Sequence, residues 1–218
     1  MPTIEWNQRW KRDLEKWTAE GQEQPFGYQW GDPDQMDCLR EVRERFLLPY
    51  VDPGATALEI GCGGGRWTRD LLGFGRLYCV DIHAEMFHYL LERFGPQAHV
   101  SFVRSTGSDL PSVPARSLDF VFSFGTFVHL DPPLVEEYLR NLAPLLRPYA
   151  HVVIQYSDKR KPRAAGNPGF APMDVELMHA LLARTGFAVE EEQNETLPHS
   201  NIVRARLARA GHPLRAVR

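Results

Sequence analysis

The stretch LEIGCGGGRW, residues 58–67, places four glycines within ten positions directly after an apolar run. Glycine inside a helix or strand costs about 0.5–1 kcal/mol relative to alanine, so such a cluster needs a compensating role. Glycines permit a tight turn and let a ligand approach the backbone closely. The stretch therefore predicts a buried strand that ends in a ligand-binding turn, with a helix after it whose first N–H groups face the ligand.

Short apolar segments alternate with amphipathic ones on both sides of this turn. We expect strands at 56–60, 76–81, 99–104, 118–124 and 151–157, and helices between them at 65–73, 84–94 and 131–147. Nearly continuous apolar strands that alternate with helices are typical of a parallel sheet covered on both faces. After a helix at 174–185, two strands near 187–193 and 201–208 follow each other without a helix, so we expect them to form an antiparallel pair.

Two helices are expected before the sheet. The first lies within 4–20, where apolar residues recur at helical spacing: Trp6, Trp10, Leu14 and Trp17. The second is expected to begin at Asp32, with Pro33 in its first turn and Gln35 closing a capping box. We predict three parts: a helical extension over 1–50 that covers the cleft, a ligand-binding domain over 51–210 and a tail over 211–218.

The composition is that of an ordinary globular chain of 218 residues, with a net charge of −3. This balance provides no basic field and disfavours nucleic acid as a partner. Cys38, Cys62 and Cys79 lie far apart, so neither a disulfide framework nor a metal site is expected. No apolar run approaches the roughly 20 residues of a membrane helix. We expect a cytoplasmic protein, without a membrane partner, that is a monomer or a homodimer.

An acid follows the glycine turn at the distance that sugar recognition requires. Asp81 ends the second expected strand, about twenty residues after Gly61, where a carboxylate can accept hydrogen bonds from both hydroxyls of a ribose. A dinucleotide fold usually has a third glycine where this chain has Arg66. Glu59, two residues before Gly61, is not part of the dinucleotide pattern either. A buried carboxylate there favours a cofactor whose amino-acid end carries an ammonium group.

At this point the sequence resembles a known family. ALEIGCGGG (57–65) is similar to motif I of the class I S-adenosylmethionine-dependent methyltransferases, and YCVDIHAEM (78–86) is similar to their second-strand motif. SDLPSVPARSLDFVFSFGTFVHL (108–130) resembles the stretch that runs through their fourth strand. The resemblance implies an α/β fold with a doubly wound, mostly parallel seven-stranded sheet in the order 3-2-1-4-5-7-6. Its last strand would be antiparallel, and helices would cover both faces.

The resemblance also implies a cofactor, S-adenosylmethionine, with S-adenosylhomocysteine as its product. Asp81 would bind the ribose, Ile82 would lie beside the adenine, and Cys62 would pack against the ligand. The full set of expected cofactor-binding residues is Glu59, Gly61, Cys62, Gly63, Asp81, Ile82, Met86, Gly107, Ser108, Ser123 and Phe124.

Two positions depart from the family pattern. Many relatives carry an acid after the third strand that contacts the adenine amino group, whereas this chain has Thr106. We expect the backbone of Gly107 or Ser108 to make that contact instead. Before the fifth strand, Tyr149 and Ala150 stand where relatives often have two glycines.

Candidate residues for the acceptor side follow from topology, because ligands of open parallel sheets bind at the carboxyl ends of the strands. His129 follows the fourth strand and is the candidate general base, whereas Asp131 is expected to cap the next helix. Tyr28 and Trp30 could close over the substrate. The basic run Lys159, Arg160 and Lys161 after the fifth strand could hold an acidic group such as a phosphate or carboxylate.

The predicted reaction is transfer of a sulfonium methyl group to an O or N atom of a small-molecule acceptor, with an acidic or sugar group on that acceptor as one option. Three alternatives remain open: a nicotinamide-dependent oxidoreductase, a cofactor-binding module without catalysis and an RNA methyltransferase. The chain reads SFGT (123–126) after the fourth strand, without an NPPY-like tetrapeptide, which counts against amide or base amino nitrogens as acceptors.

Overall fold

The computed structural model describes residues 31–208, together with Arg12, Lys16 and Ala19. These three N-terminal residues are helical and exposed. The rest of the helix expected at 4–20, the candidate substrate residues Tyr28 and Trp30, and the tail at 211–218 lie outside the described residues. The role of the N-terminal extension as a cover for the cleft therefore stays a prediction.

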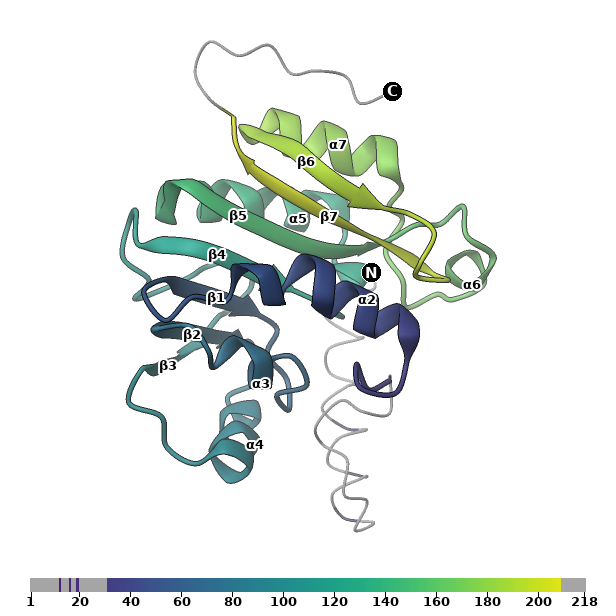
Figure 1. Ribbon diagram of the computed structural model, residues 1–218. Coiled ribbons are helices and arrows are strands. Elements are labelled where there is room, and N and C mark those ends of the chain that lie inside the picture. Colours follow the sequence, from purple (N-terminus) through teal and green to yellow (C-terminus); the bar gives the residue numbers. More distant parts are fainter. Residues whose placement is uncertain (1–11, 13–15, 17–18, 20–30, 209–218) are drawn as a thin grey trace.

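The centre of the fold is a seven-stranded sheet in the order β3-β2-β1-β4-β5-β7-β6 (Figure 1). Its strands are β1 (Thr56–Ile60), β2 (Arg76–Asp81), β3 (Val100–Arg104), β4 (Leu118–Ser123), β5 (Leu146–Ser157), β6 (Phe187–Gln193) and β7 (Ser200–Leu207). β1 pairs in parallel with both β2 and β4, whereas β7 is antiparallel to β5 and to β6. The predicted strand order and the antiparallel last strand are confirmed.

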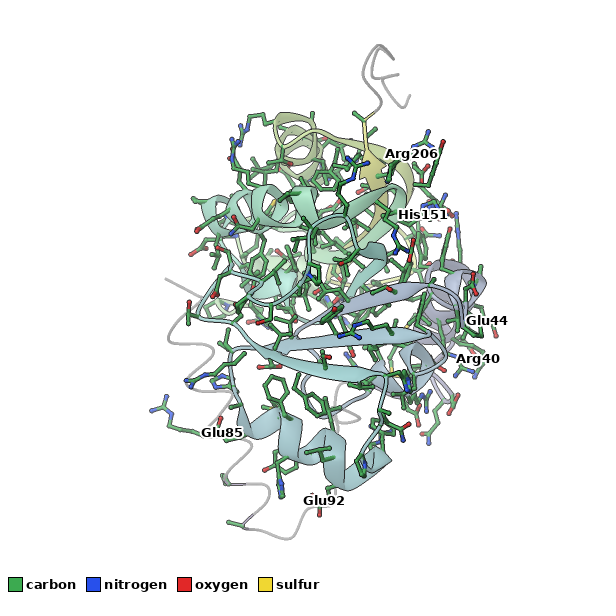
Figure 2. All side chains as sticks on the ribbon, turned by 90° about the vertical axis from the view of Figure 1, so that its left-hand side faces the viewer. Arg40, Glu44, Glu85, Glu92, His151 and Arg206 are labelled. Atoms are coloured by element: carbon green, nitrogen blue, oxygen red, sulfur yellow. The ribbon has the colours of Figure 1, made fainter. Side chains whose placement is uncertain are left out.

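Helices cover both faces of the sheet. They are α2 (Asp37–Phe46), α3 (Thr68–Leu71), α4 (Glu85–Phe94), α5 (Pro132–Leu142), α6 (Pro162–Ala165) and α7 (Val175–Arg184), with short 3-10 turns at η2 (Leu48–Tyr50), η3 (Phe127–His129) and η4 (Ala143–Leu145). One buried cluster joins the sheet to α2, α3 and α4, and the other joins it to α5 and α7. Polar side chains such as Arg40 on α2 and Glu92 on α4 project away from the sheet (Figure 2).

The alternation of β1 explains how one strand serves both faces. Leu58 and Ile60 belong to the cluster with α5 and α7, whereas Ala57 belongs to the cluster with α2 and α3. Successive side chains of a strand point to opposite faces. Glu59 therefore lies on the same face as Ala57, beneath α3, and it is buried there.

Some expected element boundaries are wrong, each for a local reason. The helix expected at 65–73 spans only Thr68–Leu71, because Gly65 has φ +91° and cannot belong to a right-handed helix. Residues 32–35 form a turn in which the Asp34 N–H donates to Asp32 Oδ1, so α2 begins at Asp37 and no capping box forms at Asp32.

Two further boundaries differ near β5. The helix expected at 131–147 ends at Leu142, where the Ala143-Pro144-Leu145 turn replaces it. β5 begins at Leu146 instead of residue 151, and Tyr149 is an exposed residue within the strand. The chain thus continues as a strand where relatives of the resembled family often have glycines.

Candidate functional site

Two glycines of the turn between β1 and α3 have different tasks. Gly61 has φ +76°, and a Cβ atom there would lie 1.8 Å from Thr126 Oγ1, so the close packing of β4's end against the turn requires glycine. Gly63 has φ +50°, but a Cβ atom there would meet nothing within 4 Å. Gly61 therefore serves the fold, whereas Gly63 borders open space at the tip of the turn.

Asp81 lies beside Gly63 at the carboxyl end of β2. Its Oδ2 accepts a hydrogen bond from the Gly63 N–H at 3.0 Å and its Oδ1 accepts one from the His83 N–H at 2.9 Å. The side chain is 9% exposed, and burial raises the pKa of its carboxyl. Backbone groups on both sides thus fix the carboxylate plane next to the open tip of the turn, where it can accept further hydrogen bonds from a ligand.

Glu59 is the second buried acid at the turn. It is 2% exposed, and its Oε2 accepts a hydrogen bond from Thr68 Oγ1 at 2.6 Å. Burial raises the pKa of Glu59 to about 8, and the neighbouring carboxylate of Asp81 adds to this shift. Such a group gains from a cationic partner, because a nearby positive charge stabilises its ionised form.

Cys62 lies inside the turn and is buried. Burial raises the pKa of its thiol well above the ordinary value, and Cys79 is its hydrogen-bonding neighbour. A thiol in this state is not nucleophilic at neutral pH. The expectation of a small packing residue at 62 is in keeping with this environment.

Arg66 is a feature of the turn that the sequence analysis did not assign to the site. Its guanidinium lies over the rings of Trp67 and Phe124, 5.6 and 5.3 Å from their centroids, and Nη1 donates to the Gly31 carbonyl at 3.3 Å. The residue is 9% exposed, and burial lowers its pKa to about 10, so it stays charged at neutral pH. The sequence signal that could have assigned Arg66 to the site was its position, as a basic residue directly after the glycine turn.

The end of β4 closes the turn from the other side. The fully buried Ser123 donates through Oγ to the Ile60 carbonyl at 2.9 Å, and Thr126 Oγ1 donates to the same oxygen at 3.3 Å. Phe124 packs on Trp67 with ring centroids 4.7 Å apart. Ser123 thus holds β1 and β4 together, while Phe124 is partly exposed beside Arg66.

The loop after β3 forms the side on which the adenine is expected. Asp109 Oδ1 accepts hydrogen bonds from Thr106 N–H at 2.6 Å and from Ser105 Oγ at 2.8 Å. Ser108 accepts two hydrogen bonds from Asn141 Nδ2, at 3.1 and 3.2 Å, through its carbonyl and Oγ. The loop is therefore tied to itself and to α5.

Three other residues of the expected cofactor-binding set have different exposures. A Cβ atom on Gly107 would meet nothing within 4 Å. Ile82 is partly exposed after β2, and Met86 on α4 is buried at 1% exposure. Contacts of all three with a cofactor stay predictions.

His129 lies in η3, directly after β4. Its Nδ1 lies 2.7 Å from the Gly169 carbonyl oxygen, which requires a proton on Nδ1 and makes Nε2 the acceptor nitrogen. Its ring packs on Phe170, which in turn packs on His199, with centroids 5.5 and 4.9 Å apart. Burial lowers the pKa of His129 to about 4, so the imidazole is neutral at pH 7.

The capping role predicted for Asp131 is only partly correct. Asp131 occupies the N-cap position of α5, and its carbonyl accepts from the Leu134 and Val135 N–H groups. Its side chain, however, makes no capping hydrogen bond. Pro132 and Pro133, which follow directly, have no N–H to donate, so fewer donors need a side-chain acceptor there.

The basic run after β5 is bonded within the chain. Lys159 Nζ donates to the carbonyls of Ala164 and Asn167 at 2.9 and 2.7 Å. Arg160 makes a two-pronged ion pair with Asp158, at 3.0 Å through Nε and through Nη2. Lys161 Nζ donates to the carbonyls of Asn194, Leu197 and Ser200. These contacts fasten the loops at the carboxyl edge of the sheet, and the expected substrate role of the run stays a prediction.

The strand order, the glycine turn after β1 and the buried acid at the end of β2 together define a Rossmann-like fold of the methyltransferase type. Residues 57–149 match a protein family described as "Methyltransferase domain". The chain is also 31% identical over 115 residues to the tRNA U34 carboxymethyltransferase of Pseudoalteromonas translucida (strain TAC 125), which is 50% of this chain and 34% of that protein. The chain thus spans about a third of the length of this curated relative.

Solved structures give the same fold. The N-methyltransferase NodS from Bradyrhizobium japonicum WM9, in complex with S-adenosyl-L-homocysteine, has a TM-score of 0.69 at 17% identity, and the match covers 92% of this chain and 97% of NodS. A SAM-dependent methyltransferase from Aquifex aeolicus has a TM-score of 0.66 at 21% identity, with 90% and 98% covered. The chain therefore has the fold of these methyltransferases.

Within the part of the chain that the structure describes, no helix has the length and apolar character needed to cross a membrane. The expected cytoplasmic location stays a prediction.

Proposed function

We propose that this chain transfers the methyl group of S-adenosylmethionine to an O or N atom of a small-molecule acceptor. The observation that carries the proposal is the buried Asp81 carboxylate, which backbone N–H groups hold beside the open tip of the glycine turn. A carboxylate in this position can accept hydrogen bonds from both hydroxyls of a ribose. Retention of this arrangement favours a working cofactor site over an ordinary strand-to-helix turn.

The residues at the turn fit the chemistry of the whole cofactor. Asp81 would bind the ribose, the open space at Gly63 would admit the amino-acid end, and Glu59 would pair with its ammonium group. When bound, the cofactor supplies a sulfonium methyl group, which is already activated for in-line displacement. The protein then has to align the acceptor and exclude water, and positioning of this kind contributes up to ~7–11 kcal/mol in model systems.

His129 is the candidate catalytic residue on the acceptor side. With its proton on Nδ1 and a pKa of about 4, it is a neutral hydrogen-bond acceptor at pH 7 and a weak base. It would orient the acceptor rather than take up a full proton from it. A neutral amine or a carboxylate acceptor needs no stronger base.

Cofactor selectivity tests the proposal directly. We expect S-adenosylhomocysteine at micromolar concentration to raise the melting temperature, because ligand that binds only the folded state stabilises it. NADH is expected to leave the melting temperature unchanged, since position 66 lacks the third glycine of the dinucleotide pattern. Stabilisation by NADH and not by S-adenosylhomocysteine would instead support the oxidoreductase reading.

Glu59 gives the cofactor site a pH dependence. Its folded-state pKa of about 8 lies above the usual 4.5, so between these values the folded, unliganded protein holds more protons than the unfolded chain. The Glu59 contribution to stability is therefore present below pH 4.5 and is lost as the pH rises toward 8.

At pH 7, pairing of Glu59 with the ligand's ammonium group is expected to release about one proton per bound S-adenosylhomocysteine. Calorimetric titrations in buffers of different ionisation enthalpy measure this number. Glu59→Gln, which carries no titratable group, serves as the control and is expected to release none. A wild-type value near zero at pH 7 would contradict the release of a Glu59 proton on ligand binding.

The acceptor is tested by methyl transfer from labelled S-adenosylmethionine to two pools. One pool holds acidic small molecules and sugar nucleotides, and the other holds unmodified tRNA. We expect label in the first pool, because the chain carries a net charge of −3 and RNA binding depends on cations that neutralise phosphates. Label found in tRNA alone would overturn the small-molecule part of the proposal and favour the substrate type of the curated relative.

A further inference from the structure

Arg163 is the cation that the stretch after β5 leaves unpaired. The three basic residues before it bond to carbonyls of the chain or to a carboxylate, as described above. The Arg163 side chain, by contrast, makes no hydrogen bond or ion pair within residues 31–208. It lies on α6 and is exposed. A guanidinium has five N–H donors in a planar fork, so the binding capacity of Arg163 is available to a ligand.

The surroundings of Arg163 are electropositive. α6 lies beside the connection between β6 and β7, which contains His199 (Figure 1). The charged groups that act on His199 are both cations, Lys161 and Arg163, and together with burial they lower the pKa of its imidazole. Lys161 keeps its charge there, because its hydrogen bonds go to uncharged carbonyls. This part of the carboxyl edge of the sheet therefore attracts anions, although the chain has a net charge of −3.

His199 belongs to a row of three rings that leads to the candidate catalytic residue. Its ring centroid lies 4.9 Å from that of Phe170, which lies 5.5 Å from that of His129. His199 Nδ1 is buried and has no hydrogen-bond partner among the described residues. A buried polar atom in this state needs an explanation, and a polar ligand at this ring would supply the missing partner. The row thus connects the cations at α6 with His129 at the end of β4.

We infer that Arg163, together with His199, binds an anionic group of the methyl acceptor, a carboxylate or a phosphate, while the accepting O or N atom lies near His129. The inference rests on the proposed function and narrows its acceptor to a small organic anion. The planar fork of arginine matches carboxylates and phosphates through two parallel hydrogen bonds. Lys161 is anchored to carbonyls and contributes its charge, whereas Arg163 is free within the described residues to make the contact.

The experiment uses three small ring compounds as probes: phenyl phosphate, benzoate and benzamide, which is the uncharged counterpart of benzoate. Their affinities are measured by NMR titration of the protein saturated with S-adenosylhomocysteine. Salt is held at about 0.1 M, which screens exposed charges more than roughly 10 Å away. We expect the wild type to bind at least one of the two anions about tenfold or more tightly than benzamide. The tighter anion identifies the group as a phosphate or a carboxylate.

Arg163→Gln is expected to weaken binding of the preferred anion about tenfold and to leave benzamide binding unchanged. Because Arg163 is exposed and unpaired within residues 31–208, this substitution removes the charge without breaking a contact of the described fold. Arg147→Gln is the matched control. Arg147 is also exposed, but it lies at the opposite end of β5, where it pairs with Asp119 at 2.6 Å. This variant is expected to bind all three probes as the wild type does.

The inference and the proposed function fail in different ways. Anion binding that Arg163→Gln leaves unchanged, or that Arg147→Gln weakens equally, would overturn the inference. Benzamide binding as tight as that of both anions in the wild type would overturn it as well. In each of these cases S-adenosylhomocysteine would still bind and the proposed function would stand. Failure of the wild type to bind S-adenosylhomocysteine would instead remove the proposed function, on which the assignment of this anion to an acceptor depends.

Discussion

Asp81→Ala is expected to weaken S-adenosylhomocysteine binding at least about 100-fold and to abolish the ligand-induced rise in melting temperature. The reason is that one carboxylate would accept hydrogen bonds from two ribose hydroxyls, and each hydrogen bond to a charged group contributes roughly 1.5–3 kcal/mol. The carboxylate is already oriented by the N–H groups of Gly63 and His83, so little rearrangement offsets the gain on binding. Isothermal titration calorimetry at fixed pH measures the change.

Asp70→Ala provides the control for this substitution. Asp70 lies on α3, close in sequence to the turn, and faces Arg43 and Arg69 at 3.8 and 3.6 Å. Its removal takes away one partly buried acid without touching the ribose position, so ligand affinity is expected to stay within about threefold. An Asp81→Ala protein that binds as tightly as the Asp70→Ala protein would contradict ribose recognition by Asp81.

Two glycine substitutions are expected to separate folding from binding. In Gly61→Ala the new methyl group would collide with Thr126 at a left-handed φ, which overpacks the turn and is expected to cost about 2–4 kcal/mol of stability. In Gly63→Ala the methyl group meets no protein atom within 4 Å, so only the left-handed backbone penalty of about 1–2 kcal/mol remains. That methyl group would, however, occupy space needed by the ligand and is expected to weaken its binding by at least about tenfold.

Denaturant unfolding of the two variants ranks their stabilities, and ligand titration of the same proteins ranks their affinities. Gly61→Ala should be the less stable protein, and Gly63→Ala should lose more affinity while folded. Combining Gly61→Ala with Thr126→Gly removes the collision partner and is expected to recover part of the stability. The opposite ranking in both measurements would show that Gly63, not Gly61, is the packing glycine.

The sheet could be predicted because its signals are local and redundant. Apolar strand segments, glycine at 61 and an acid at 81 each favour the same parallel arrangement, and the strand order then followed from the resemblance. The apolar spacing could not show that the helix expected at 65–73 begins only at Thr68, because Trp67 and Leu71 also have the spacing of a helix. The left-handed φ of Gly65 decides that boundary.

The side-chain partners were less accessible to sequence reasoning. Lys161 looks like a free cation in the run after β5, yet its carbonyl acceptors include Leu197 and Ser200, which only the hairpin of β6 and β7 brings near. Arg66 was noticed as a departure from the dinucleotide pattern, but its aromatic neighbour Phe124 comes from β4. Contacts between segments that are distant in the sequence leave no local sequence pattern, so these side-chain partners could be identified only from the folded structure.

The most direct measurement is a crystal structure of the protein with S-adenosylhomocysteine. We predict the adenosine across the carboxyl ends of β1 and β2, with both ribose hydroxyls within hydrogen-bond distance of the Asp81 carboxylate and the amino-acid end at Gly63. A ligand bound elsewhere, or a complex in which the Asp81 carboxylate does not touch the ribose, would contradict this.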